Sequence, residues 1–160
     1  MFTQRASNDR KHFNQYFFLQ KTNKYRKSIS KYILDKEFLE KLKLIIKKYK
    51  INKNNEIALQ LFDTDIPEAM YMAIVIVDPN KIEKDTINEW LNRTDYSLLT
   101  TSGIALLAAD SPHSMELVNE WIKDTPKHKA CAYACLNGSI IKDPNFDIEI
   151  IEKYLKIIED

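Results

Sequence analysis

The amino-acid sequence predicts an all-α protein built as a solenoid of helical hairpins, with about eight to ten helices. Three observations lead to this class. The 160 residues include only two glycines, so the tight turns of β-sandwiches and β-barrels have few suitable residues. Capping signals alternate with apolar stretches of helical length. A sequence pattern also recurs about every 32 residues, which is typical of stacked helical units.

The repeat is clearest in a five-residue motif. Ile-Asn-Glu-Trp-Leu at 87–91 recurs as Val-Asn-Glu-Trp-Ile at 118–122 and, more loosely, as Ile-Glu-Lys-Tyr-Leu at 151–155. Turn signals with a helix-ending proline keep the same spacing, at 78–80, 110–112 and 143–145. Two helices fit between successive turns, and each pair must bury a face on its neighbours. The period, without tetratricopeptide or ankyrin signatures, indicates HEAT-like hairpins.

Helix starts are predicted at four capping residues, Asp65, Asp95, Thr125 and Asp147. The stretch Met70–Val77 is rich in β-branched residues and reads as a buried strand by propensity alone. Its place in the repeat matches that of Ala-rich helices, so we interpret it as a helix. Trp90 and Trp121 recur at the repeat spacing, which favours packing anchors over ligand-stacking platforms.

The net charge of +1 hides a strong asymmetry. Residues 1–53 carry 15 Lys and Arg against 4 Asp and Glu, whereas residues 54–160 carry 9 against 19. We therefore interpret 1–160 as one repeat domain with basic N-terminal helices over 1–53 and helical repeats over 54–160. On a predicted helix over 35–49, apolar residues share one face and lysines the other. Such a distribution indicates a nucleic-acid face, a self-complementary fit, or solvated helix faces.

Several function classes are disfavoured. Two glycines 35 positions apart cannot form a GxGxxG turn or a phosphate loop, so no nucleotide cofactor is expected. Cys131 and Cys135 fit one helix face, and the three histidines are scattered, so neither a metal site nor any other cofactor is predicted. The apolar run Ala69–Val77 is far shorter than the ~20 residues of a membrane span, and the N-terminus is polar. We expect a cytoplasmic protein without a membrane partner.

Motifs spread over most of the chain resemble the AlkD-like DNA alkylation repair family. The similar segments are 58–62, 67–69, 78–79, 87–90 and 95–97, the N-terminal 16–18, 21–22 and 25–31, and the apolar helix 129–136. Members of this family are HEAT-like glycosylases that excise cationic alkylated purines. The resemblance implies a HEAT-like fold and a DNA partner, and this sequence is a short, degenerate example of the pattern.

The resemblance also carries site residues. The family's cleft tryptophan corresponds to Tyr96, its catalytic aspartate to Thr100, and its cleft arginine to Lys129. A threonine carries no charge to stabilise the oxocarbenium-like sugar as a glycosidic bond breaks. We therefore expect weak or absent base excision, and a protein that is not an enzyme. The residues expected to bind DNA are Lys129, Lys21, Lys24, Arg26 and Lys27.

Three functions stay open at this stage. The first is a protein that binds double-stranded DNA through a basic face, with weak or no excision activity. The second is a HEAT-like module that binds a protein on its concave face, without nucleic acid. The third is an active alkylpurine DNA glycosylase. The resemblance favours the first.

Overall fold

The computed structural model describes residues 36–143 and 145–159. The chain divides into two compact units, Met1–Leu42 and Lys43–Asp160. In the first unit the described residues are the beginning of helix α2 (Lys36–Tyr49), where Lys41 pairs with Glu37 one turn earlier at 2.6 Å. The helix matches the 35–49 prediction. The expected DNA contacts at Lys21, Lys24, Arg26 and Lys27 lie outside the described residues.

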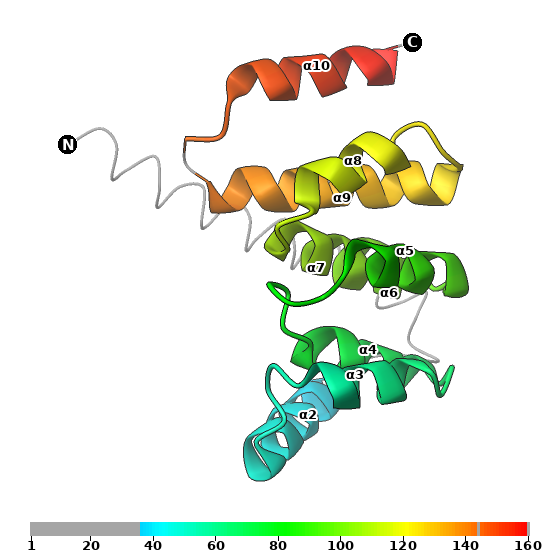
Figure 1. Cartoon of the computed structure of the whole chain (residues 1–160), viewed down its shortest axis with the longest axis vertical. Coiled ribbons are helices and arrows are strands. Elements are labelled where there is room, and N and C mark those ends of the chain that lie inside the picture. The colour runs from blue at the N-terminus through cyan, green and yellow to red at the C-terminus, as the bar shows by residue number, and fades with distance from the viewer. Residues whose placement is uncertain (1–35, 144, 160) are drawn as a thin grey trace, which may run out of the picture. The chain divides into compact units, whose positions relative to one another are not determined.

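The prediction of an all-α fold is confirmed, since the described part of the chain contains helices and turns and no strand. After α2 the elements are α3 (Asn55–Phe62), α4 (Pro67–Ile76), α5 (Lys84–Arg93), α6 (Ser97–Leu99), the π-helix η1 (Thr100–Ile104), α7 (Ala105–Asp110), α8 (Ser114–Trp121), α9 (Pro126–Lys142) and α10 (Ile148–Glu159). Figure 1 shows the second unit as hairpins stacked one above another, from α3 and α4 to α8 and α9.

Each hairpin has a first helix and a second helix that follows it, and the repeated motif lies in the first helices α5, α8 and α10. The pairs are α3 with α4, α5 with the continuous helix α6–η1–α7, and α8 with α9, while α10 is a further first helix. The stretch Met70–Val77 forms most of α4, and Met70, Ala73 and Ile76 are buried there. The position in the repeat therefore overrides the strand propensity.

Helices begin within two residues of all four predicted capping residues, but only two of the four residues cap them. The Thr125 side chain accepts a hydrogen bond from the His128 N–H, and Asp147 accepts one from the Glu149 N–H at 2.9 Å. Asp65 does not cap α4, because Ile66 is the cap residue and Asp65 has a left-handed φ of 53°. Asp95 lies before the cap residue Tyr96 of α6. Both aspartates instead pair with cations of neighbouring helices.

Within the second compact unit, consecutive helical repeats are joined by hydrogen bonds. In each, an aromatic side chain donates to an asparagine of the preceding repeat. The Trp121 Nε1–H donates to Oδ1 of Asn88 at 2.6 Å, and the Tyr154 hydroxyl donates to Oδ1 of Asn119 at 2.6 Å. Trp121 and Tyr154 are each only 2% exposed, so the polar atoms of these rings need protein partners. In the five-residue motif, the asparagines hold the second position and the aromatic residues hold the fourth. We call this arrangement the aromatic-to-asparagine ladder.

The first two helical repeats are joined by stacked aromatic rings. Trp90 holds the aromatic motif position in α5, and its ring lies parallel to that of Phe62 in α3, with centroids 4.1 Å apart. The guanidinium carbon of Arg93 lies 5.4 Å from the Phe62 ring centroid, within cation–π range. Trp90 and Phe62 are fully buried, so the tryptophans are packing anchors as the repeat spacing predicts.

Both glycines lie where second helices of adjacent units approach closely. A Cβ on Gly138 of α9 would come within 3.0 Å of the Ala109 Cβ and 3.2 Å of Leu106 Cδ2. A Cβ on Gly103 would come within 3.1 Å of Ile74 Cδ1 in α4. Neither glycine has a positive φ, so both are needed for space rather than for a turn.

The helix α6–η1–α7 contains a π-helical segment that the sequence did not predict. In this segment the Ala105 N–H donates to the Thr100 carbonyl, five residues earlier. The same carbonyl accepts a weak hydrogen bond from the Cys131 Sγ of α9 at 3.4 Å. In this π-helical turn the Thr100 carbonyl thus accepts a hydrogen bond from α9 of the next helical repeat.

We expect Asn88→Leu to lower the free energy of unfolding by about 1–3 kcal/mol, because it leaves the buried Trp121 Nε1–H without an acceptor. Urea denaturation followed by tryptophan fluorescence measures this loss. Asn92→Leu is the matched control one turn later, at an exposed side chain, and is expected to stay within about 0.5 kcal/mol of the natural chain. Equal losses for the two variants would contradict a ladder that depends on Asn88.

Candidate nucleic-acid interface

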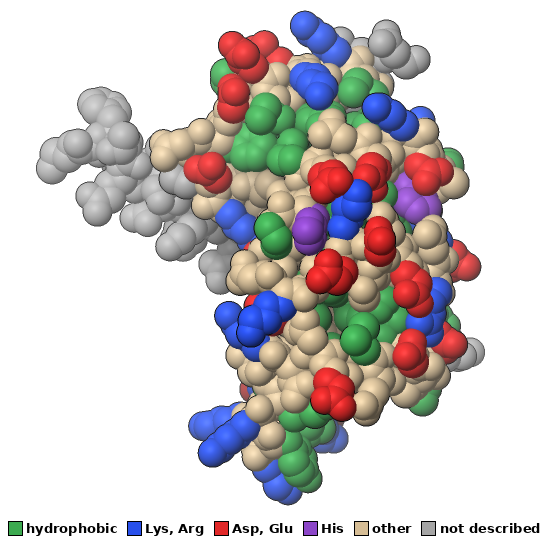
Figure 2. All heavy atoms as spheres, viewed as in Figure 1, with side chains coloured by type: hydrophobic (Ala, Val, Ile, Leu, Met, Phe, Trp, Pro, Cys, Tyr) green, Lys and Arg blue, Asp and Glu red, His purple; other side chains and the backbone are tan. Residues whose placement is uncertain are grey.

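Exposed lysines of the second unit gather at the C-terminal end of α2 and in the connection to α3. Lys47, Lys48, Lys50 and Lys53 are all exposed, and we call these four residues the basic turn. Figure 2 shows Lys and Arg side chains concentrated at this end of the face in view. Lys50 and Lys53 have left-handed φ angles of 52° and 59°. That conformation costs a residue with a Cβ about 1–2 kcal/mol, so the surrounding contacts must hold the turn in place.

Backbone hydrogen bonds provide those contacts. The Ile51 N–H donates to the Ile46 carbonyl at 3.3 Å, and the Asn54 N–H donates to the Ile76 carbonyl at 3.0 Å. The Asn54 side chain also caps α3, accepting from the Ile57 N–H at 3.0 Å. The lysines of the basic turn therefore extend from a backbone that is fixed to both α3 and α4.

Thr100, which the sequence resemblance aligns with a catalytic aspartate, is not at the surface. Thr100 is 3% exposed, and its hydroxyl donates to the Ser97 carbonyl at 3.0 Å. Tyr96 is 48% exposed at the start of the same helix. The two side chains thus differ in access, since the tyrosine ring meets solvent and the threonine hydroxyl is engaged inside the helix.

Lys129 lies in the first turns of α9 and is exposed. Its N–H donates to the Thr125 carbonyl at 2.9 Å, as the first full turn of the capped helix requires. The ammonium group of Lys129 can therefore meet an external anion. No contact joins Lys129 to Tyr96 or to the basic turn in the described residues, so the predicted site residues are not gathered into one cluster.

Other cations of the repeats are engaged by carboxylates of adjacent units. Lys84 of α5 pairs with Glu116 at 2.6 Å and Glu120 at 2.8 Å of α8. Arg93 of α5 pairs with Asp63 at 2.7 Å and Asp65 at 2.9 Å, after α3. Figure 2 shows red carboxylates around blue cations over this part of the surface. These cations bind neighbouring units, which reduces their availability to phosphate.

The ion pairs shift the titration of their members. The hydrogen bonds that Lys84 donates to Glu116 and Glu120 raise its pKa, and those that Arg93 donates to Asp63 and Asp65 raise the pKa of Arg93. The reciprocal hydrogen bond from Lys84 lowers the pKa of Glu120. Lys84, Arg93 and Glu120 are therefore charged over the neutral range.

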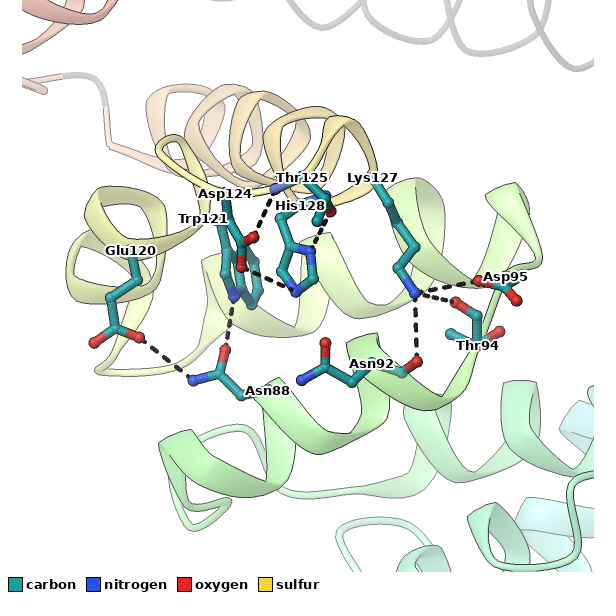
Figure 3. Close-up of polar contacts among 10 residues, drawn as sticks. All are labelled: Asn88, Asn92, Thr94, Asp95, Glu120, Trp121, Asp124, Thr125, Lys127 and His128. Carbon is teal, nitrogen blue, oxygen red and sulfur yellow. Dashed lines mark hydrogen bonds and ion pairs between the residues drawn. The ribbon is translucent and has the colours of Figure 1, made fainter.

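The start of α9 is held against the end of α5 (Figure 3). The Lys127 ammonium donates to the carbonyls of Asn92 at 3.4 Å and Thr94 at 3.2 Å, and it pairs with Asp95 at 3.2 Å. A cation at a helix C-terminus satisfies terminal carbonyls and interacts favourably with the helix dipole. Lys127 thus joins two repeats, and no feature of the sequence distinguishes it from the exposed Lys129.

Cys131 and Cys135 are free cysteines with buried side chains. Burial raises the pKa of the Cys135 thiol to about 12, and that of the Cys131 thiol rises further for the same reason. Both thiols are therefore protonated and poorly nucleophilic at neutral pH.

No group of three His, Cys, Asp or Glu residues suited to a metal ion occurs in residues 36–143 and 145–159. Within those ranges no helix has the length and apolar character of a membrane span.

These features define a stack of HEAT-like helical hairpins, and a solved structure has the same fold. It is described as a new family of proteins related to the HEAT-like repeat DNA glycosylases with affinity for branched DNA structures. The TM-score is 0.70 at 22% sequence identity, over 76% of this chain and 52% of that one. The predicted fold is thereby confirmed.

Two uncharacterized proteins are similar in sequence, Lin0241 of Listeria innocua serovar 6a and Lmo0209 of Listeria monocytogenes serovar 1/2a. Each is 30% identical over 84 residues, which cover 51% of this chain and 37% of the relative. The matched region thus spans little more than a third of each relative's length. No protein-family profile matches the sequence.

We expect Lys84→Met to reduce the loss of stability in acid. Because the folded pKa of Glu120 is lowered, its pairing with Lys84 stabilises fully above the ordinary glutamate pKa, and the stabilisation disappears as the pH falls through the lowered value. Urea midpoints measured between about pH 7 and about pH 3 should therefore fall less steeply for the variant than for the natural chain. Lys81→Met, at an exposed lysine 4.0 Å from Asp78, is the control and should keep the natural slope. Parallel profiles for natural chain and Lys84→Met would contradict this assignment.

Proposed function

We propose that this protein binds DNA, with a preference for branched structures, and does not excise bases. The observation that carries the proposal is the basic turn, four exposed lysines on a backbone fixed to α3 and α4. Lysines in a fixed arrangement can meet successive phosphates and release the counterions condensed on DNA. Lys21, Lys24, Arg26 and Lys27, earlier in the same basic region, and the exposed Lys129 add further candidate contacts.

The shared fold supports a DNA partner of this kind. The protein with the similar structure is described as having affinity for branched DNA, and it too is related to glycosylases. The resemblance to the alkylation repair family leads independently to DNA. Branched DNA differs from a linear duplex in the spacing of its phosphates and in bases exposed at the branch, so lysines and an exposed aromatic ring can distinguish it.

Tyr96 is the candidate for contact with an exposed base or sugar. Its ring is 48% exposed at the start of the α6–η1–α7 helix. Stacking of a base on an aromatic side chain contributes about 1–3 kcal/mol without regard to sequence. Such a contact suits a protein that recognises DNA structure rather than a base sequence.

The geometry at Thr100 argues against excision. The hydroxyl is buried and donates to the Ser97 carbonyl, so it offers neither a charge nor a free donor to a sugar. The nearby Asp95 carboxylate pairs with Lys127 at 3.2 Å. Stabilising an oxocarbenium-like transition state requires a negative charge beside the sugar, and the side chain of Thr100 supplies none.

Fluorescence anisotropy with a four-way junction and a linear duplex of equal length tests DNA binding. We expect the junction to bind more tightly, and log affinity to fall linearly with log salt concentration, by about 0.9 per phosphate contacted. Replacing the four lysines of the basic turn with alanine should weaken binding at least about tenfold and make the salt slope shallower. Lys129→Ala should reduce the slope by about one.

The matched control replaces three exposed lysines elsewhere, Lys81, Lys123 and Lys156, and should lose much less affinity. An unchanged urea midpoint for each variant shows that the stack is intact. Absence of binding at low salt, or equal losses in both variants, would overturn the proposal.

Excision is tested separately on duplex DNA that carries cationic alkylated purines. We expect no release of free base above the spontaneous rate, for the natural chain and for Tyr96→Ala alike. Base release by the natural chain that is abolished in Tyr96→Ala would identify an active glycosylase and would contradict our interpretation of Thr100.

A further inference from the structure

Tyr49 is an exposed aromatic residue among the lysines of the basic turn. It is the last residue of α2, it lies between Lys48 and Lys50, and its side chain is 62% exposed. Of the Phe, Tyr and Trp side chains that the structure describes, those of Tyr49 and Tyr96 are the exposed ones. The ring of Tyr49 therefore contributes little to the core and is open to a ligand.

The backbone on both sides of Tyr49 is fixed. Lys50 has a left-handed φ of 52°, so α2 ends directly after Tyr49. The Ile51 N–H donates to the Ile46 carbonyl at 3.3 Å, and this hydrogen bond spans Tyr49. The side chains of Ile46 and Ile51 both pack against the hydrophobic core. The backbone of Tyr49 thus needs no ordering when a ligand binds to its ring, which lowers the entropic cost of the contact.

The ring lies in a surface of one charge. Residues 43–55 include five lysines and no aspartate or glutamate. The Lys48 ammonium lies 5.1 Å from the Tyr49 ring centroid, within cation–π range. Asp78, whose N–H donates to the Asn55 side chain at 2.8 Å, is only 7% exposed. Figure 2 shows hydrophobic side chains between lysines at the lower end of the face in view, where α2 lies in Figure 1. This surface suits an anion that carries a flat apolar group.

We propose that Tyr49 stacks on an unpaired base at the branch point of DNA, a specificity-determining contact that rests on the proposed DNA binding. A nucleotide joins a flat base to a phosphate, so the ring can take the base while the lysines beside it meet the phosphates. A linear duplex keeps its bases paired along its length and offers mainly its phosphates. Tyr49 therefore adds affinity for branches with an unpaired base, whereas the lysines add affinity for all DNA.

Fluorescence anisotropy with a three-way junction that has a single unpaired base at its branch point tests this contact. We expect Tyr49→Ala to weaken binding at least about fivefold, the lower end of what stacking on one base contributes. Tyr49→Phe should keep the natural affinity, because the ring is retained. The salt dependence of binding should stay the same in both variants, because neither removes a cation.

An abasic nucleotide in place of the unpaired base isolates the contact with the ring. The natural chain should bind the abasic junction at least about fivefold more weakly, and Tyr49→Ala should bind both junctions alike. Leu44→Ala is the matched control, at an apolar side chain of the same helix that is 65% exposed, and should leave both affinities unchanged. Urea midpoints equal to that of the natural chain verify that each variant is folded.

An affinity that Tyr49→Ala leaves unchanged would overturn this inference and leave the proposed DNA binding intact. So would an equal loss for Leu44→Ala, or losses for Tyr49→Ala and for the abasic nucleotide that simply add. Absence of binding to either junction at low salt would instead overturn the proposed function, and this inference with it.

Discussion

The hydrogen bond from a buried aromatic ring to the asparagine of the preceding unit is the constraint on which the stack depends. An indole or phenol inside an apolar interface has one polar atom to satisfy, and Asn88 and Asn119 supply acceptors at 2.6 Å. Because a hydrogen bond is directional, it fixes the register between units, which apolar packing alone leaves adjustable. The stack of Trp90 on Phe62 has the same place at the beginning of the series.

Once the register is set, charged residues one repeat apart are brought together. Lys84 meets Glu116, Lys127 meets Asp95 and Lys142 meets Asp110, each pair separated by 32 positions. The acidic balance of residues 54–160 thus partly reflects carboxylates that bind cations of the next or the previous unit. This use of charge limits where DNA can bind, because Lys84, Arg93 and Lys127 pair with carboxylates inside the stack, whereas the four lysines of the basic turn are exposed.

The period and the helical class could be predicted because Trp90, Trp121 and their neighbours recur in sequence. The asparagine acceptors could not be identified, since a polar motif position reads equally well as a solvated one. The residue type of Asp65 and Asp95 predicts helix caps, but their carboxylates pair with Arg93 and Lys127, which are distant in sequence. The π-helix lies where Gly103 and Cys131 make contacts between repeats, and local propensity does not encode such contacts. Of the predicted site residues, Lys129 and Tyr96 are exposed, whereas the burial of Thr100 followed from tertiary packing alone.

The two glycines of this chain have a consequence for how such a protein can change in evolution. Gly103 and Gly138 each occupy a crossing between second helices of adjacent units, with neighbouring atoms near 3 Å from the place of a Cβ. A unit copied whole would carry its glycine and its asparagine acceptor with it, and so would fit its neighbours at both ends. Loss or gain of a few residues within a unit would misplace both. Whole-unit duplication is therefore the route to length change that this architecture tolerates.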